Sequence, residues 1–342
     1  MSQGKKVCIA VDAMGGDYAP AEIVKGVVLA GQRGDVEIVL VGQVDTMEEE
    51  LAKHDGSGLP IRLVEATEVV REGEPPASAV RRKPNSSVVV ATKLVKSGEA
   101  DAMVSAGPSG AVAVSAVQHL GMLEGMERPA LGGGFGSFAP GVLLIDLGAN
   151  VDCKPYQLVA FAIAGSVYAT QFLGVPNPTV GLLSTGAEEG KGNELVREGY
   201  HLLKGSGVNF VGNVEGSDIL TGKANVVVCD GFVGNVLLKF YESIGEYALG
   251  WMRHKLRRHP PLSWMVKLAF DRVLPIAKLS YEGEEAGSGI LWGVNGIVRV
   301  AHGACRASHI AHGIAGAKKA VMADIIGILK PELERFKREG KL

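Results

Sequence analysis

Five segments of the chain have a composition that suits the binding of an anion. Each follows a short apolar run and combines glycine with Asp, Asn, Ser or Thr. The segments are residues 12–17 (DAMGGD), 105–110 (SAGPSG), 146–150 (DLGAN), 184–186 (STG) and 230–235 (DGFVGN). Backbone N–H groups near a helix start bind phosphate oxygens, and glycine allows a close approach. Together the segments predict an anion site, although a tight turn with a helix cap explains any single one.

The motifs of common nucleotide and metal enzymes are absent from the sequence. Residues 186–192 (GAEEGKG) resemble a P-loop, but three residues separate the first glycine from Gly190, and Gly192 replaces the required Ser or Thr. No G-x-G-x-x-G opens a helix, no G-x-S-x-G occurs, and the eight histidines form no H-E-x-x-H. The sequence therefore predicts neither a nucleotide cofactor nor a metal.

The elements that would position these segments alternate along the chain. Short apolar runs predict buried strands at 7–11, 36–41, 61–64, 102–104, 142–145, 180–183 and 226–229. Apolar residues at helical spacing predict helices at 20–30, 86–96, 154–172 and 193–203. This alternation is typical of an α/β fold with a doubly wound, mostly parallel, Rossmann-like sheet, in which ligands bind at the carboxyl ends of the strands.

The composition narrows the class of protein. The 342 residues, 46% of them hydrophobic, can bury a large core, and we expect a single α/β catalytic domain over residues 1–342. A net charge of −2 gives no support for a nucleic-acid partner. The four cysteines lie far apart, and the N-terminus has no apolar signal segment, so we expect a cytoplasmic location.

Residues 243–280 differ from the remainder of the chain. They predict a broken pair of amphipathic helices in which tryptophans lie beside basic residues. Such a surface suits the headgroup region of an anionic membrane, so we expect peripheral membrane association. The residues expected to touch the membrane are Trp251, Trp264, Met265 and Leu268. A dimer contact or a core helix remains the alternative.

The segments in order resemble one known family, the PlsX phosphate acyltransferases of bacterial phospholipid synthesis. The resemblance rests on VDAMGGD at 11–17, DLGANVDCKP at 146–155, EEGKGNE at 188–194, GNVE at 212–215 and CDGFVGN at 229–235. It continues to GVNG at 293–296 and covers nearly the whole chain. The resemblance implies an isocitrate/isopropylmalate-dehydrogenase-like fold and a homodimer.

The resemblance also implies an activity, which is transfer of a long-chain acyl group from acyl carrier protein to inorganic phosphate. The acyl phosphate would serve the membrane glycerol-3-phosphate acyltransferase. Lys191, next to a predicted helix start, is the expected cation, because a lysine there is unfavourable unless an anion is bound. Our hypothesis is that Lys191 neutralises phosphate and the oxyanion, while Asn235 donates a hydrogen bond.

Further residues are expected to contact phosphate or substrate. They are Asp12, Gly15, Gly16, Asp17, Lys83, Ser86, Ser105, Ser109, Asn150, Asp152, Glu189 and Asn193. The acidic members either cap helices or fix Lys191 and bound water. The basic run 81–83 before a helix start either holds phosphate, meets the acidic carrier protein, or is a solvated turn.

Two other functions fit the same sequence. One is acetyl or butyryl transfer from coenzyme A to phosphate, against which the amphipathic segment favours a lipid-linked substrate. The other is a catalytically silent module that binds lipid or carrier protein. Departures from the family pattern at Pro108 and Ser184 are the best argument for the silent module.

Overall fold

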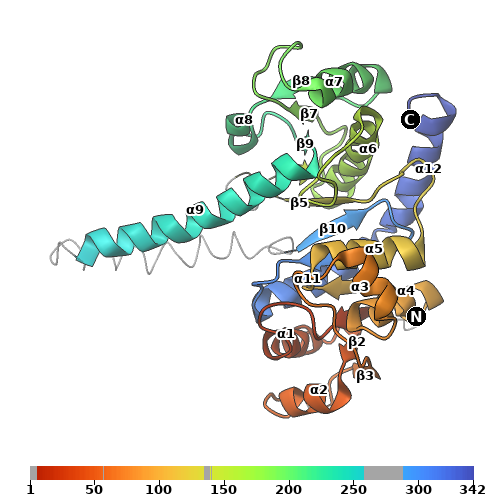
Figure 1. The fold of residues 1–342 in the computed structure, drawn as a ribbon, viewed down its shortest axis with the longest axis vertical. Coiled ribbons are helices and arrows are strands. Elements are labelled where there is room, and N and C mark those ends of the chain that lie inside the picture. The colour runs from red at the N-terminus through yellow and green to blue at the C-terminus, as the bar shows by residue number, and fades with distance from the viewer. Residues whose placement is uncertain (1–5, 57, 135–138, 140, 258–287) are drawn as a thin grey trace.

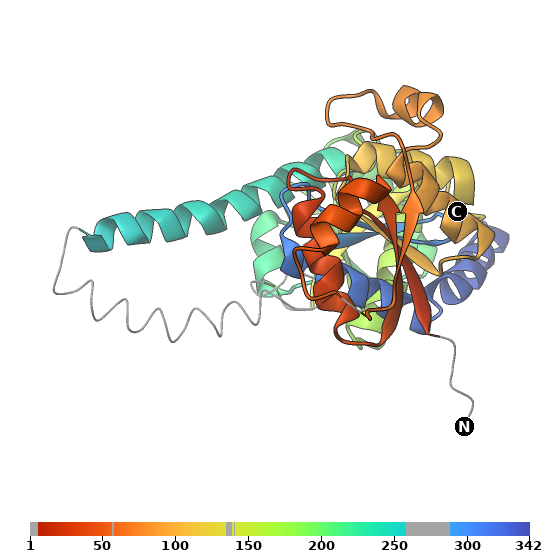
Figure 2. The same cartoon turned by 90° about the horizontal axis from the view of Figure 1, so that it is seen from below.

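The computed structural model describes residues 6–56, 58–134, 139, 141–257 and 288–342. They form an extended, twisted sheet with helices on both faces (Figure 1, Figure 2). Three residues of the predicted membrane surface, Trp264, Met265 and Leu268, lie outside the described residues.

The strands of the described residues belong to one sheet of eleven. They are β1 (Val7–Asp12), β2 (Val36–Gly42), β3 (Ile61–Glu65), β4 (Ala102–Ser105), β5 (Ala130–Gly134), β6 (Leu143–Ile145), β7 (Val180–Leu183), β8 (Phe210–Val214), β9 (Val226–Val228), β10 (Ser288–Trp292) and β11 (Ile297–Ala301). Across the sheet the order is β3-β2-β1-β4-β11-β10-β5-β6-β9-β7-β8. All seven predicted strands are confirmed, and β5, β8, β10 and β11 are additional.

Strand direction reverses in the middle of the sheet. The strands from β3 to β11 pair in parallel, as do those from β6 to β8. Between them β10 is antiparallel to both neighbours, and β5 is antiparallel to β6. The predicted mostly parallel sheet is confirmed. The carboxyl ends of the strands, however, fall into two groups instead of one common edge: β1, β4 and β11 form one, and β6, β9 and β7 the other.

Helices cover both faces, which confirms the doubly wound arrangement. They are α1 (Ala21–Gly31), α2 (Val44–Leu51), α3 (Pro76–Arg82), α4 (Ser87–Ser97), α5 (Ser109–Leu120), α6 (Pro155–Phe172), α7 (Glu194–Ser206), α8 (Gly216–Thr221), α9 (Gly231–Arg257), α11 (Ala307–Met322) and α12 (Ile325–Arg338). Residues of α1, α6, α11 and α12 form one continuous core along one face. Residues of α3, α4 and α5 pack on the opposite face of β1, β2, β4 and β11, and α8 and the start of α9 cover β6 and β9.

Both faces of the central strands are apolar, as β1 illustrates. Ile9 and Val11 belong to the core beneath α1 and α11, whereas Cys8 and Ala10 belong to the core beneath α4 and α5. Successive side chains of a strand point to opposite faces, so a strand covered on both sides needs an uninterrupted apolar run. This is why the short apolar runs located the strands correctly.

Helix α9 begins at the body of the protein and extends well beyond it (Figure 1, Figure 2). Large apolar side chains are exposed along it at intervals of three or four residues, which places them along one side of the helix. They include Val236, Phe240, Ile244, Tyr247 and Trp251. Within the described part of the chain, no helix is both long and apolar enough to cross a membrane.

Candidate active site

The ends of β1 and β4 are joined by a buried carboxylate. The hydroxyl of Ser105 donates to Asp12 Oδ2 at 2.7 Å, and the N–H of Met14 donates to Asp12 Oδ1 at 3.1 Å. Burial raises the pKa of Asp12, although the hydrogen bonds from the two serines, Ser87 and Ser105, oppose the shift. A Cβ on Gly15 would lie 2.6 Å from the backbone nitrogen of Gly107. Only glycine at position 15 therefore lets the two strand ends come so close.

The turn after β1 also contacts the end of β11. Gly16 has a φ of +112°, a conformation that side chains rarely adopt, and the N–H of Asp17 donates to the carbonyl of Gly303 at 2.8 Å. The carboxylate of Asp17 is exposed. Three strand ends, those of β1, β4 and β11, thus meet around residues 12–17.

Lys83 and Ser86 are engaged within their own loop. The ammonium of Lys83 lies 2.6 Å from Glu74 Oε1 and 2.8 Å from the carbonyl oxygen of Val69. The buried hydroxyl of Ser86 donates to the carbonyl of Lys83 at 2.8 Å. These contacts anchor the segment before α4, and contact of either side chain with phosphate stays a prediction.

The turn after β6 is organised by Asp146, a residue to which the sequence assigned no role. Its fully buried carboxylate accepts hydrogen bonds from the backbone of Leu131, Gly148, Ala149 and Asn150, at 2.8–3.1 Å. The side-chain amide of Asn150 donates to Asp146 at 2.7 Å and to the carbonyl of Pro129 at 2.6 Å. Burial raises the pKa of Asp146 in spite of these bonds. Asn150 is therefore part of the turn.

The first turn of α9 is pressed onto that same loop. The carboxylate of Asp230 caps the helix by accepting the N–H of Val233 at 2.8 Å. A Cβ on Gly234 would overlap the carbonyl oxygen of Asp146. A Cβ on Gly148 would lie 3.2 Å from the Cβ of Asn235, so the Asn235 side chain packs on this glycine. Asn235 is thus held at the carboxyl ends of β6 and β9.

The loop from β7 to α7 carries Lys191. The carbonyl of Glu188 accepts the backbone N–H of Lys191 at 3.0 Å, and Asn193 caps α7 by accepting the N–H of Val196 at 3.0 Å. The side chain of Lys191 is exposed, and its ammonium makes no hydrogen bond or ion pair with the described residues. Glu189 instead lies 3.3 Å from the ammonium of Lys204 on α7.

The two groups of strand ends approach each other at a small cavity. Ser109 and Gly110 at the start of α5 line it together with Gly148 and Ala149 of the β6 turn. Its volume is about 30 Å³, which is the room for a single water molecule. The structure thus places Asn150, Asn235, Lys191 and Asn193 at the ends of β6, β9 and β7. The start of α5, which follows β4, lies at their border. Asp152, which follows the turn after β6, is exposed, and its contact with phosphate or substrate stays a prediction.

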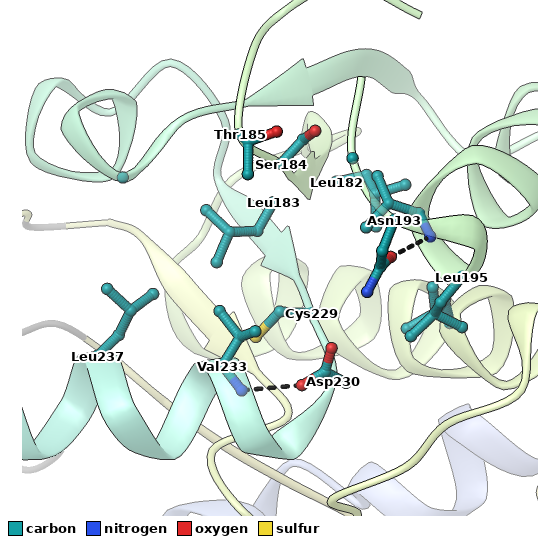
Figure 3. Close-up of a pocket in the computed structure, with 14 residues that line it drawn as sticks. Leu182, Leu183, Ser184, Thr185, Asn193, Leu195, Cys229, Asp230, Val233 and Leu237 are labelled. Carbon is teal, nitrogen blue, oxygen red and sulfur yellow. Dashed lines mark hydrogen bonds between the residues drawn. The ribbon is translucent and has the colours of Figure 1, made fainter. Parts of the chain in front are cut away.

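A larger apolar pocket of about 310 Å³ lies between the first turns of α7 and α9 (Figure 3). Its lining includes Leu158, Leu182, Leu183, Ser184, Thr185, Gly192, Asn193, Leu195, Val196, Gly216, Cys229, Asp230, Val233 and Leu237. The pocket therefore directly adjoins the loop that carries Lys191 and the helix that carries Asn235.

The cysteines near this site are unsuited to nucleophilic attack. Burial raises the pKa of Cys153 to about 12 and that of the fully buried Cys229 well above its ordinary value. Because the thiolate is the nucleophilic form, neither thiol is reactive near neutral pH. In the described residues, no three His, Cys, Asp or Glu side chains gather as metal ligands would.

Comparison with known proteins gives the class of enzyme to which the chain is similar. Residues 7–327 match the family model described as "Fatty acid synthesis protein". A protein of Pelotomaculum thermopropionicum named "Phosphate acyltransferase" is 43% identical over 337 residues, covering 97% of this chain and 96% of the relative. One of Desulfitobacterium hafniense with the same name is 47% identical over 330 residues, covering 96% and 98%.

Solved structures show the same fold at low sequence identity. EutD phosphotransacetylase from Staphylococcus aureus is 18% identical, with a TM-score of 0.58 over 94% of this chain and 95% of that one. A Salmonella typhimurium protein described as a 4-hydroxythreonine-4-phosphate dehydrogenase is 13% identical, with a TM-score of 0.53 over 92% and 99%. The α/β class predicted from the sequence is confirmed by these neighbours.

The named relatives, at 43% and 47% identity over nearly the whole chain, define it as an acyltransferase. It belongs to the fatty acid synthesis protein family, as the match over residues 7–327 establishes. The resemblance to phosphate acyltransferases seen in the sequence is thereby confirmed.

Proposed function

We propose that this enzyme transfers a long-chain acyl group from acyl carrier protein to inorganic phosphate and so supplies acyl phosphate for phospholipid synthesis. The observation that carries the proposal is the position of Lys191. Its exposed ammonium makes no ion pair with the described residues, and it lies beside the N-terminus of α7 and an apolar pocket. A cation next to hydrocarbon-lined space suits an anionic acceptor that attacks an acyl group.

The reaction needs charge stabilisation more than proton transfer. A phosphate oxygen attacks the thioester carbonyl carbon, and the C–O bond forms as the oxyanion develops. The C–S bond then breaks, and the thiol, with a pKa near 8.5, leaves as thiolate and takes a proton from solvent. Phosphate is itself the nucleophile, so no enzyme thiol is required. This agrees with the raised pKa of Cys153.

Lys191 and Asn235 divide the stabilisation between them. The ammonium of Lys191 neutralises phosphate as it approaches the carbonyl, and the amide of Asn235 donates to the reacting oxygens. Each such group contributes roughly 3 kcal/mol to lowering the barrier. Gly15, Gly16, Ser105 and Ser109 shape the border of the site. Asp12 holds the turn after β1, and Glu189 pairs with Lys204 of α7. Contact of Asp17 and Asp152 with phosphate or substrate stays a prediction.

The test combines long-chain acyl carrier protein with phosphate and measures hydroxylamine-reactive acyl phosphate. Lys191→Ala is expected to lower kcat/KM by about 10²- to 10³-fold because it removes the cation. Lys25→Ala, which removes an exposed lysine on α1, is the matched control and should leave the rate unchanged. A folded Lys191→Ala protein with a near-normal rate would refute the proposal.

Two alternatives have distinct outcomes in this assay. Transfer from coenzyme A to phosphate is favoured by the structural likeness to a phosphotransacetylase, and it predicts that acetyl-coenzyme A is the better donor. A silent binding module predicts no acyl phosphate from any donor. The apolar pocket of about 310 Å³ favours the long-chain donor, because an acetyl group would leave most of it empty.

Contacts with other molecules form a second part of the proposal. The exposed apolar side of α9 suits either a second copy of this chain in a homodimer or a membrane surface, where the glycerol-3-phosphate acyltransferase would use the product. Tyr247→Glu with Trp251→Glu should release monomers in sedimentation if the side is a dimer contact. Loss of flotation with anionic vesicles would assign it to the membrane.

Arg81 and Arg82, exposed at the end of α3, suit the acidic carrier protein.

A further inference from the structure

The apolar pocket is lined by residues of β7 and of four helices, α6, α7, α8 and α9. Leu195 and Val196 come from the first turn of α7, and Val233 and Leu237 from the first two turns of α9. Leu158 of α6 and residues 182–183 of β7 also line it. In Figure 3, Leu183 lies opposite Val233 and Leu237. The space is thus lined largely by aliphatic side chains that are fixed on regular structure.

Two of the polar side chains around this space cap helices. Asn193 accepts the N–H of Val196, and Asp230 accepts the N–H of Val233, so both are occupied as helix caps (Figure 3). The buried hydroxyl of Ser184 has no hydrogen-bond partner among the described residues. Because most of the remaining wall is leucine and valine, a ligand with many polar groups would leave most of them unsatisfied, at a cost of about 1–3 kcal/mol each. The pocket therefore suits hydrocarbon.

The border of the pocket has the opposite character. The N-terminus of α7 reaches it, is capped by the neutral side chain of Asn193, and carries a partial positive charge of about half a unit. Lys191 lies two residues before the cap of α7. The complementary ligand has a hydrocarbon tail and an anionic head.

We propose that this pocket binds the hydrocarbon chain of the acyl group and places its carbonyl beside Lys191. The identity of the tail as an acyl chain rests on the proposed function. A methylene group fills about the same volume as a water molecule, roughly 30 Å³. The volume of about 310 Å³ then has room for on the order of ten methylene groups. Longer chains extend out of the pocket.

Alkyl phosphates test this proposal without any turnover. Calorimetry with the full-length enzyme and butyl, hexyl, octyl, decyl and dodecyl phosphates, below their micelle concentrations, gives the affinity for each length. Affinity should rise by about fourfold for each methylene group buried and should level off at roughly ten carbons. An affinity that does not depend on chain length would overturn the proposal.

A narrowed pocket should move the point at which affinity levels off. Leu195→Trp adds bulk to the wall on α7, so the plateau should fall by about two carbons and dodecyl phosphate should bind roughly 15-fold more weakly. Leu202→Trp is the matched control, because Leu202 is 44% exposed on the same helix and does not line the pocket. Leu237→Trp repeats the test from α9 if the first variant fails to fold. An unchanged length profile in a folded variant would assign the chain to another surface.

The binding and turnover experiments can contradict the two proposals independently of each other. Absence of acyl phosphate from every donor would overturn the proposed function, while the plateau and its shift would still assign the pocket to hydrocarbon. Normal turnover with an unchanged length profile in Leu195→Trp would overturn the pocket and leave the proposed function intact.

Discussion

Asn213, at the end of β8, holds the loop that carries Lys191. This residue is 2% exposed, and its side-chain amide donates to the carbonyl of Glu188 at 2.8 Å. The same carbonyl accepts the backbone N–H of Lys191 at 3.0 Å. Asn213 therefore fixes the peptide that positions Lys191, and we expect Asn213→Ala to disturb the enzyme chiefly through that lysine.

The effect of Asn213→Ala on stability should be small. The lost hydrogen bond costs about 1 kcal/mol, and the space left by the amide costs on the order of another 1 kcal/mol. The amide oxygen of Asn213, however, is buried without a partner among the described residues, so its removal returns about 1 kcal/mol. The net loss of about 1 kcal/mol should lower the Tm by roughly 2 °C.

The effect on activity should be larger than the effect on stability. A catalytic group misplaced by about 1 Å can lower a rate by about 10²-fold, so we expect kcat for acyl phosphate formation to fall roughly 10- to 100-fold. In a Lys191→Ala background, the same Asn213→Ala change should have almost no further effect. This non-additivity is the sign that Asn213 acts through Lys191.

Asn209 provides the control for this experiment. Its side-chain amide donates to the carbonyl of Asn177 at 3.0 Å, in an exposed contact away from Lys191. Asn209→Ala should therefore leave kcat unchanged in both backgrounds. If Asn213→Ala lowers the rate by the same factor with and without Lys191, or does not lower it at all, the positioning role is wrong.

Two further predictions concern the glycine and aspartate turns. Gly234→Ala places a Cβ on the carbonyl oxygen of Asp146 and should displace the start of α9, costing on the order of 3 kcal/mol in urea unfolding. Gly205→Ala, in open space within α7, should instead stabilise by up to about 1 kcal/mol, and equal effects would contradict this account. Burial raises the pKa of Asp12 above its ordinary 3.8, so the stability it contributes is present below pH 3.8 and declines as pH rises through the folded-state pKa. Asp12→Asn should remove that decline. The measurement is the unfolding free energy of both proteins from pH 3.5 to 7, and a difference between them that stays constant over this range would contradict the prediction.

The strands could be predicted because their signal is local, whereas their order in the sheet could not. The apolar runs of β1, β2 and β4 are continuous because both faces of these strands are covered. β5 has the sequence ALGGG and shows no such signal. Its Gly132 is needed because the indole of Trp292 on β10 passes where a Cβ would stand, 2.6 Å away. The reversal of the sheet thus depends on contacts between residues far apart in sequence.

The same contrast between local signals and long-range contacts applies to the candidate site. The positions of Lys191 and Asn193 follow from a helix start, which is visible in the sequence. The partners of Lys83, which are Glu74 and a backbone carbonyl, depend on how the loop folds back. The role of Asp146 had one signal, an acidic residue two positions before a glycine at a strand end. That signal did not distinguish a turn-forming carboxylate from one that faces a ligand.

The hydrogen bonds of the glycine turns make Lys191 more important than the sequence alone suggests. The N–H groups of residues 148–150 donate to Asp146, and those of Gly107 and Met14 donate to Ser105 and Asp12. A phosphate that took the donors of residues 148–150 would leave a buried carboxylate unsatisfied, and it would be repelled by the same charge. The turns therefore serve mainly to hold their strand ends together. The positive charge that phosphate needs must come mainly from Lys191, because the N-terminus of α9 is already capped by the carboxylate of Asp230. This is why Lys191→Ala should abolish most of the rate and no neighbouring turn should compensate.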